Sequence, residues 1–227
     1  MIDYKKYREC FEKSGLFNGI SEDRYENVLS CLGAKEAKYN MGSSLVMEGD
    51  TNYRAGIVLE GNLEEFIYDE NSTPVIIRRL EKGDIFGAEL ACSKSLASQF
   101  SLEATSNTSV LLLDFGSLMS VNTLTCPCRM QVTANLLQEL AGQVNLFNVK
   151  VRILSQKKLR DKIKVFLQTQ SMDEEGVIRL PFKRSKMAEF LYVDRSALSR
   201  ELSRMRDENI ITLSGTQIKI IDKGFLQ

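Results

Sequence analysis

The sequence predicts an α+β fold. An N-terminal antiparallel β-roll of the double-stranded jelly-roll type, with flanking helices, is followed by a long helix and a C-terminal winged helix-turn-helix. Three observations support it: glycine-spaced β-rich runs over residues 42–115, an apolar heptad from residue 130 onward, and two amphipathic helices before a hairpin near the end. We therefore divide the chain into a β-roll domain (1–129), a dimerisation helix (130–155) and a winged helix domain (156–227).

Charge is distributed unevenly along the 227 residues, although 30 Lys and Arg balance 30 Asp and Glu. Residues 151–227 carry 16 basic and 10 acidic side chains, whereas residues 1–150 carry 14 basic and 20 acidic ones. A basic C-terminal part favours a phosphate backbone as partner, with chance variation on a solvated surface as the alternative. Apolar runs fall short of the ~20 residues of a membrane span, and the first residues lack the apolar core of a signal peptide. We expect a cytoplasmic protein with no membrane partner.

The N-terminal part combines helices with short strands. Residues 1–37 carry apolar side chains at helical spacing. Beyond them, β-forming runs alternate with glycines, where turns with positive φ are expected. The expected strands are Ser44–Glu48, Ala55–Glu60, Leu63–Tyr68, Val75–Leu80, Ser101–Thr105 and Val110–Phe115. Such frequent short strands are typical of an antiparallel barrel or jelly roll.

A heptad repeat predicts that the long helix pairs with a second copy. Its apolar positions follow one another at alternating steps of three and four residues: Met130, Thr133, Leu137, Leu140, Val144, Phe147, Val151 and Leu154. A repeat of this length is typical of a coiled-coil seam, and two-fold dimers are the commonest oligomers. We expect all of these residues except Thr133, the weakest member, to form a homodimer interface. A helix packed only on its own chain is the alternative, since Leu136, Leu146 and Ile153 widen the apolar stripe.

Two short helices joined by a tight turn are expected over residues 184–205. In the second, Asp194 is placed to cap the N-terminus. One face is apolar and comprises Leu198, Leu202 and Met205. The remaining surface carries Arg195, Ser196, Ser199, Arg200 and Ser203. Arginine can grip guanine with two hydrogen bonds and serine can contact a base or a phosphate, so this surface suits a DNA major groove. A hairpin over residues 210–220 would form the wing, and a merely solvated amphipathic helix is the alternative.

The order of these elements resembles the Crp/Fnr family of bacterial transcription regulators across essentially the whole chain. The resemblance rests on Gly42, Gly49-Asp50, Gly61, Gly83-Asp84-Ile85-Phe86-Gly87 and the segment from Asp194 to Arg206. It implies a homodimer that senses a signal in the β-roll and binds promoter DNA at an inverted repeat, with RNA polymerase as a candidate partner. It also implies base contacts from Arg195, Ser196, Ser199 and Arg200, and phosphate contacts from Arg184 and Ser185.

The sequence departs from the family's pattern at functional positions. Ser196 replaces a glutamate that reads a base, and Tyr192 replaces a turn glycine, where a side chain would be strained. Members that bind cyclic AMP have a glutamate in place of Ala88, and an arginine–serine pair in place of Ser98 and Gln99. Without that cation a cyclic phosphate would lose charge-assisted hydrogen bonds worth ~1.5–3 kcal/mol each. Cyclic AMP is therefore not the expected effector. The expected pocket, which holds another small molecule or none, comprises Phe86, Gly87, Glu89, Ser98 and Gln99.

The five cysteines raise a redox alternative for the signal. The candidates are Cys92, Cys126 and Cys128, because Cys92 follows the Phe86-Gly87 turn and the other two precede the long helix. Iron–sulfur and zinc sites require about four ligands, and this chain has scattered cysteines and no histidine. Neither site is predicted, haem is disfavoured, and no metal site is expected. We favour the simpler interpretation that these cysteines are small packed side chains.

An enzyme is not expected from this sequence. No histidine is available as a general base, and no nucleophile elbow, phosphate-binding glycine loop or zinc-protease motif occurs. A third class is a ligand-binding module that works through protein partners, with the winged helix as an interaction surface. We expect a sequence-specific DNA-binding regulator. Substitution of Arg195 or Arg200 distinguishes the regulator from the ligand-binding module, because DNA affinity would change only if the protein is a DNA-binding regulator.

Overall fold

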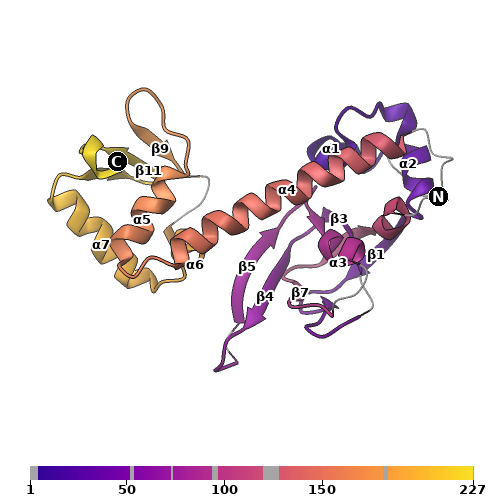
Figure 1. Ribbon diagram of the computed structural model, residues 1–227, viewed down its shortest axis with the longest axis horizontal. Coiled ribbons are helices and arrows are strands. Elements are labelled where there is room, and N and C mark those ends of the chain that lie inside the picture. The colour runs from indigo at the N-terminus through magenta and orange to yellow at the C-terminus, as the bar shows by residue number, and fades with distance from the viewer. Residues whose placement is uncertain are drawn as a thin grey trace. The chain divides into compact units, whose positions relative to one another are not determined.

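The chain forms two compact units in the computed structural model, Met1–Gly142 and Gln143–Gln227 (Figure 1). The structure describes residues 5–51, 54–72, 74–93, 97–119, 128–180 and 184–226. Each unit has its own buried core, and the long helix α4 (Arg129–Leu154) runs from the first unit into the second. Antiparallel sheets, a long helix and a winged helix confirm the predicted fold class.

Short helical segments cap the first unit: α1 (Arg8–Lys13), η1 (Gly15–Phe17), η2 (Glu22–Arg24) and α2 (Tyr25–Cys31). They pack through an aromatic cluster, in which the ring centroids of Phe11 and Tyr25 lie 4.7 and 5.0 Å from that of Phe17. The helical prediction for residues 1–37 is wrong at its end, because β1 (Lys35–Tyr39) is a strand. Its Lys and Glu content is typical of a helix, and pairing with β8 (Thr108–Leu112) imposes the strand.

Two four-stranded antiparallel sheets form the β-roll, with the orders β1-β8-β3-β6 and β2-β7-β4-β5. The strands not yet given are β2 (Ser44–Val46), β3 (Gly56–Glu60), β4 (Leu63–Tyr68), β5 (Pro74–Leu80), β6 (Ile85–Phe86) and β7 (Ser101–Ala104). Helix α3 (Ala88–Ser93) follows β6, and η3 (Phe115–Met119) follows β8. All six predicted strands are present with ends shifted by up to three residues, while β1 and β6 are absent from the prediction.

Alternation along β3 and β8 divides the core of the first unit into two layers. Ile57, Leu59 and Leu111 pack with the N-terminal helices. Val58 and Val110 point the other way and pack with residues of the second sheet. The sheet that contains β3 and β8 therefore has a helical layer on one face and the interior of the roll on the other.

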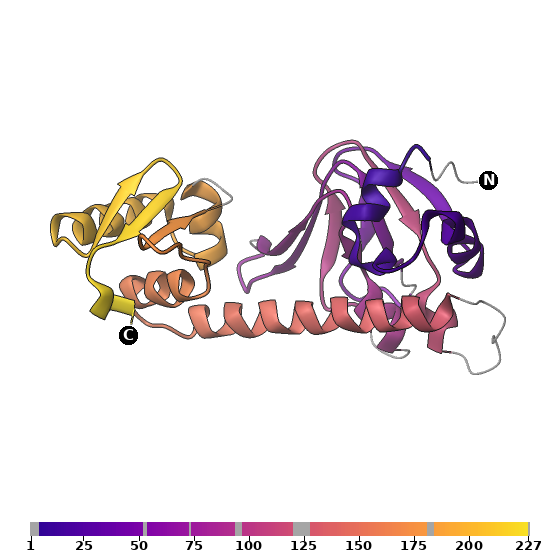
Figure 2. The ribbon, with the colours of Figure 1, turned by 90° about the horizontal axis from the view of Figure 1, so that it is seen from above.

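Helix α4 contributes side chains to both cores, and Figure 2 shows it as one continuous coil. Val132 and Leu136 are buried in the first unit, and Ile153 is buried in the second. The buried amide of Asn135 donates hydrogen bonds to the carbonyls of Leu16 and Asn18, at 2.8 Å each, which attaches the helix to η1. Although α4 has 26 residues, none of the described helices is both long and apolar enough to cross a membrane.

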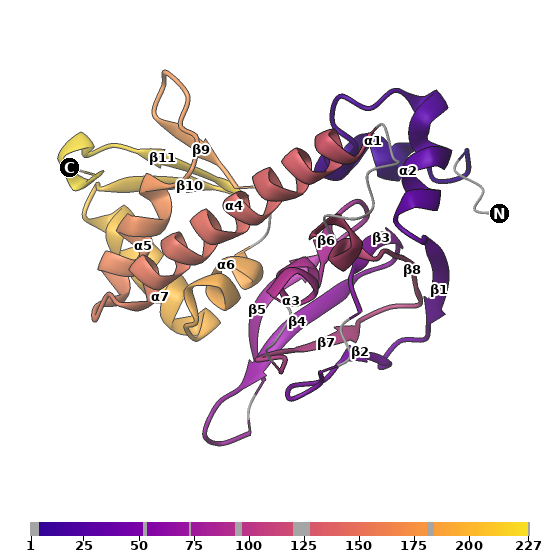
Figure 3. The same ribbon diagram turned by 45° about the vertical axis from the view of Figure 1, so that its right-hand side comes forward.

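The second unit is a winged helix. Its helices are α5 (Leu159–Gln168), α6 (Arg184–Leu191) and α7 (Arg195–Asp207), with a terminal turn η4 (Lys223–Leu226). Strands β10 (Ile211–Ser214) and β11 (Gln217–Ile220) form the predicted hairpin, and β9 (Val177–Arg179), absent from the prediction, pairs with β11 (Figure 3). The core of this unit includes Ile163, Phe166, Met187, Leu198, Leu202, Met205 and Ile211.

Candidate nucleic-acid interface

The turn between α6 and α7 is tight and contains no glycine. Tyr192 adopts a left-handed conformation with a φ of 53°, and its backbone N–H donates to the carbonyl of Glu189 at 3.1 Å. The N–H of Val193 donates to the carbonyl of Ala188 at 3.0 Å, which completes a helix C-cap usually built on glycine. The turn therefore forms at the cost of a strained tyrosine backbone.

Asp194 caps α7, as the sequence predicts. Its Oδ1 accepts the backbone N–H groups of Ser196 and Ala197, both at 2.9 Å, and the Ser196 hydroxyl donates to the same oxygen. The hydroxyl bond, followed by the backbone bonds, lowers the pKa of the Asp194 carboxyl. The cap fixes the first turn of α7 and commits the hydroxyl proton of Ser196 to Asp194.

Helix α7 separates a buried apolar face from a polar, basic one. The predicted apolar residues, Leu198, Leu202 and Met205, are at most 1% exposed. Of the predicted base-reading residues, Arg195, Ser196 and Arg200 are exposed and Ser199 is half-buried. An open hollow of about 600 Å³ on this surface is lined by Ser199, Arg200, Ser203, Arg204, Asp207 and Glu208. The hollow thus includes two of the four predicted base-reading residues, Ser199 and Arg200, and adds Arg204 beside them.

Arg184 and Ser185, the predicted phosphate contacts, are the first residues of α6 and are half-buried. The first backbone N–H groups of a helix have no acceptor within the helix. Both side chains therefore lie at the end of the helix where backbone N–H groups can bind anions.

Carboxylates of α7 form ion pairs with arginines of the same helix. Arg204 Nη1 lies 3.3 Å from Glu201 Oε2, and Arg206 Nη2 lies 2.8 Å from Asp207 Oδ1. In the part of the chain that the structure describes, Arg195 and Arg200 form no ion pair.

Arg160 of α5 is an ion-pair partner of α7 that sequence reasoning missed. It lies 2.6 Å from a carboxylate oxygen of Glu201 and 2.6 Å from one of Glu208. These partners are 41 and 48 residues away along the chain. No local spacing pattern links residues so far apart, so the sequence alone carries no signal for the pairing.

The predicted dimer seam is largely exposed on α4. Six of its seven residues are between 39% and 87% exposed: Met130, Leu137, Val144, Phe147, Val151 and Leu154. The seventh, Leu140, packs half-buried against the core of the first unit. Of the residues that raised the alternative, Leu136 and Ile153 are buried within the chain and Leu146 is exposed. Helix α4 therefore has one face packed on its own chain and another apolar face in solvent.

The five predicted effector residues differ widely in accessibility. Phe86 is fully buried, and Gly87 has a φ of 67° at a position where a Cβ atom would clash with the backbone. Ser98 is also buried, and its hydroxyl donates to the carbonyl of Phe100 at 2.6 Å. Gln99 is exposed. Ser98 therefore uses its hydroxyl within the chain.

The fifth residue, Glu89, belongs to a charged cluster that sequence reasoning missed. Arg78 of β5 donates from Nε to Glu65 Oε2 of β4 at 2.7 Å, and its Nη2 lies 3.5 Å from Glu89 Oε1 of α3. The side chains of Glu65 and Arg78 are 3% and 19% exposed. Two carboxylates thus share one guanidinium in a largely buried place. Opposite charges on two neighbouring predicted strands are a sequence signal for an ion pair between those strands. The sequence does not show which of the charged side chains face the interior, because this depends on a β-bulge after Glu65.

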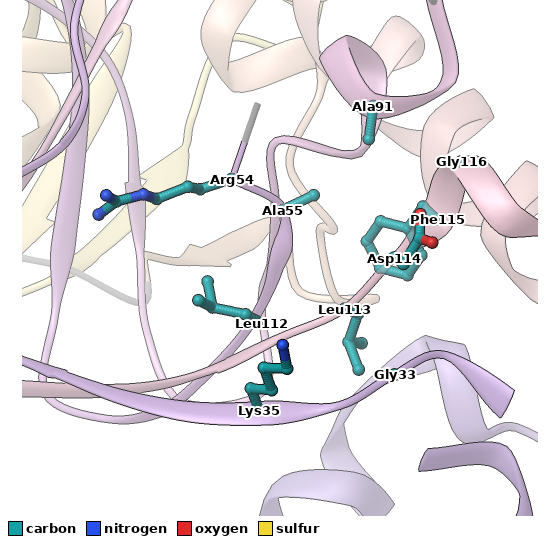
Figure 4. Close-up of a pocket in the computed structure, with 10 residues that line it drawn as sticks. All are labelled: Gly33, Lys35, Arg54, Ala55, Ala91, Leu112, Leu113, Asp114, Phe115 and Gly116. Atoms are coloured by element: carbon teal, nitrogen blue, oxygen red, sulfur yellow. The ribbon is translucent and has the colours of Figure 1, made fainter. Parts of the chain in front are cut away.

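A separate open pocket of about 360 Å³ lies at the end of β8 (Figure 4). It is lined by Gly33, Lys35, Arg54, Ala55, Ala91, Leu112, Leu113, Asp114, Phe115 and Gly116, none of which is a predicted effector residue. Figure 4 shows the Lys35 side chain reaching toward Leu112, while the Arg54 guanidinium points away. Arg54 Nη1 donates to the Tyr39 hydroxyl at 2.9 Å.

Two of the described cysteines, Cys10 and Cys92, lack the lowered thiol pKa of a thiolate sensor. Burial raises the pKa of the Cys10 thiol to about 11, and burial, with the nearby Glu89 carboxylate, also raises that of Cys92. Cys128 is buried, and Cys126 lies outside the described residues. Among the described residues, no group of three or more His, Cys, Asp or Glu side chains is placed to hold a metal ion.

Two family models match most of the chain between them. The Crp-like helix-turn-helix domain matches residues 134–227, and the cyclic nucleotide-binding domain matches residues 36–121. The chain belongs to the Crp/Fnr family of transcription regulators. Crp/Fnr membership confirms the resemblance inferred from the glycine spacing and from the sequence of α7, and it supports DNA binding as the output of the protein.

Solved structures of Crp/Fnr regulators share the fold. FixK2 from Bradyrhizobium japonicum is 22% identical with a TM-score of 0.56, over 85% of this chain and 95% of that one. The catabolite activator protein of Thermus thermophilus is 18% identical with a TM-score of 0.54, over 94% and 96% of the two chains. A CooA variant from Carboxydothermus hydrogenoformans is 18% identical with a TM-score of 0.66, over 94% of each chain. No curated protein sequence matches this chain.

Proposed function

We propose that this protein is a homodimeric, sequence-specific DNA-binding regulator that reads an inverted repeat. The β-roll (1–129) senses a signal, the long helix (130–155) dimerises, and the winged helix (156–227) binds promoter DNA in the cytoplasm. The observation that carries the proposal is that Arg195 and Arg200 are exposed and available on a helix whose opposite face is buried. Such a helix can enter a major groove while it stays packed on its domain.

Base and phosphate contacts are divided between α7 and α6. The proposed base-reading residues are Arg195, Ser196, Ser199 and Arg200, and the proposed phosphate contacts are Arg184 and Ser185. Each arginine can donate two hydrogen bonds to O6 and N7 of a guanine. Ser196 differs, because its proton is held by Asp194 and its oxygen is left to accept from a base amino group.

The exposed apolar face of α4 supports the homodimer. Burial of exposed Leu, Val and Phe side chains at heptad spacing against an identical helix would favour association. The heptad spacing also allows the same face of two chains to pack about a two-fold axis. Two recognition helices would then read half-sites ~34 Å apart, which is one turn of the duplex. An inverted repeat is the DNA sequence that matches this symmetry.

The proposed signal is a small molecule or a redox change sensed in the β-roll, and it is not cyclic AMP. Neither Ser98 nor Gln99 supplies a cation for a cyclic phosphate, and the Arg78 guanidinium near Glu89 is already shared by two carboxylates. The raised thiol pKa values of Cys10 and Cys92 favour a small molecule over a redox change. RNA polymerase is the proposed protein partner at the promoter.

Selection from a pool of random duplex DNA tests the proposal. Recovery of an inverted repeat is expected, and Arg195→Ala or Arg200→Ala should each weaken binding by ~1–3 kcal/mol and relax the preference for one base. Arg179→Ala, which removes an exposed arginine of β9 in the same unit, is the control and should change affinity little. If both recognition-helix variants bind as tightly as the wild type, the winged helix does not read DNA in this way.

A further inference from the structure

Arg160 joins α5 to α7 through a network of charged hydrogen bonds. Its Nε donates to Glu201 Oε1 at 2.6 Å, and its Nη1 and Nη2 donate to the two carboxylate oxygens of Glu208 at 2.6 and 3.0 Å. Two parallel bonds from one guanidinium to one carboxylate are the strongest form of this contact. Glu208, followed by Glu201, raises the pKa of Arg160, and Arg160 in turn lowers the pKa of Glu208.

The network holds α7 at two points. Glu201 lies in the middle of the helix and its side chain is 12% exposed, while Glu208 is the C-cap residue. Arg160 lies in the first turn of α5, whose own Ile163 and Phe166 are buried in the core of the unit. Because Arg160 projects from a packed helix, its bonds fix the rotation of α7 about its axis.

The network also provides a cation for carboxylates of α7, the proposed recognition helix. From Arg195 to Glu208, α7 and its C-cap carry four arginines and three carboxylates. Arg204 pairs with Glu201 and Arg206 pairs with Asp207, so Glu208 depends on Arg160 for its close cation. Without Arg160, Arg204 alone would face both Glu201 and Glu208. One of these carboxylates would then lack a close cation, on the helix that must approach a polyanion.

We propose that Arg160 is a positioning residue of the DNA interface, which orients α7 and neutralises its carboxylates so that Arg195 and Arg200 can engage DNA. The inference rests on the proposed function, because it assigns a role within the same interface.

Neutralising the carboxylates separates this role from simple packing. Arg160→Met removes the charge and retains an apolar stem, Glu201→Gln/Glu208→Gln removes the carboxylates, and a triple variant combines the three changes. Arg8→Met is the matched control, because it breaks an exposed arginine pair with Glu12 in the other unit. Fluorescence anisotropy with the duplex recovered by selection measures affinity at several salt concentrations, and circular dichroism checks folding.

Arg160→Met should weaken DNA binding ~10-fold. The triple variant should regain the part of that affinity that was lost to uncompensated carboxylates, because no carboxylate is left without a cation, while the part lost with the orientation of α7 should not return. The Arg8→Met control should bind like the wild type. The proposal is overturned if Arg160→Met binds like the wild type, or if the triple variant binds as weakly as Arg160→Met. If Arg160→Met does not fold, Arg160→Lys replaces it as the test, because lysine keeps the charge without the planar fork of the guanidinium. Arg160→Lys should bind DNA with intermediate affinity. Wild-type affinity of this variant would overturn the orienting role.

Hydrogen exchange distinguishes failure of this inference from failure of the proposed function. If the wild type selects no DNA, the proposed function fails, whatever Arg160 does. The backbone amides of α7 still report on the positioning role in the absence of DNA. Faster exchange in Arg160→Met than in the wild type supports that role, and equal exchange overturns it.

Discussion

Arg78 and Glu65 form a buried ion pair between β5 and β4, with 2.7 Å between Nε and Oε2. They are register partners in the sheet, and the side chain of Glu65 is 3% exposed. Removing such a pair from water is costly, and the loss of one partner leaves an uncompensated charge in the interior. The pair therefore makes the β-roll sensitive to single substitutions near Glu89.

Arg78→Met should lower the free energy of unfolding by ~3 kcal/mol, because it removes the guanidinium that pairs with the buried Glu65 carboxylate. The double variant Glu65→Leu/Arg78→Met should recover much of that loss, since two apolar side chains replace the pair. Urea denaturation of the three proteins measures the difference. A double variant that is less stable than Arg78→Met would show that the pair is a net source of stability.

Tyr192→Gly should raise the free energy of unfolding of the winged helix by ~0.5 kcal/mol. The left-handed backbone costs a tyrosine ~1–2 kcal/mol, and glycine escapes that cost but loses part of the gain through the greater entropy of its unfolded chain. Tyr192→Ala is the control, because it removes the ring and keeps the strain. Thermal unfolding followed by circular dichroism compares them, and a less stable glycine variant would mean that the ring itself stabilises the turn.

Val144→Glu should convert the proposed dimer to a monomer without unfolding the chain. The side chain is 56% exposed on α4, so a charge there costs little in a single chain but would be buried at a two-fold seam. Gln138→Glu, on an exposed part of the same helix away from the seam, should leave the dimer intact. Sedimentation velocity gives the oligomeric state. A wild-type monomer at micromolar concentration would exclude the proposed seam.

Leu136→Ala should destabilise the protein without changing its oligomeric state, which is the reverse of the effect expected for Val144→Glu. Leu136 is 1% exposed in the core of the first unit, so truncation should cost ~2–5 kcal/mol of unfolding free energy. The oligomeric state of the folded fraction should not change. Denaturation and sedimentation of the same sample test both statements, and dissociation without destabilisation would place Leu136 at the seam instead.

The Cys10 thiol should resist alkylation in the native protein. Burial raises its pKa from 9.0 to about 11, so the neutral thiol contributes stability that is fully present below pH 9 and is lost as the pH rises through 11. Exposed Cys31 should react with iodoacetamide first. Peptide mapping by mass spectrometry assigns the labelled cysteines, with denatured protein as the control. Rapid labelling of Cys10 at neutral pH would show that the N-terminal helices open easily.

The main features of the fold are readable from the sequence because they depend on local signals. Apolar periodicity predicts α7 and its buried face, Asp194 is recognisable as an N-cap, and glycine spacing locates the β-roll turns. Strand β1 is predicted as helix because its residues favour helix and only pairing with distant β8 makes it a strand. The two-residue β6 is too short to leave a periodic signal.

The candidate site is only partly readable. Contacts within α7 follow from spacing, but Arg160 and Arg78 find their partners through tertiary packing or a β-bulge. The heptad likewise predicts an apolar stripe on α4 but not which side of it the chain itself covers. Burial of Leu136 beside exposed Leu137 decides this.

Helix α4 serves both cores, and this limits how the protein can be cut or fused. A winged-helix fragment cloned from residue 156 would lack Ile153, which is fully buried in that core, whereas one cloned from residue 143 would keep it. A sensor fragment that stops at residue 129 would lose Val132 and Leu136 from its own interior. Chimaeras with other regulators therefore need a junction inside the helix that preserves both sets of buried side chains.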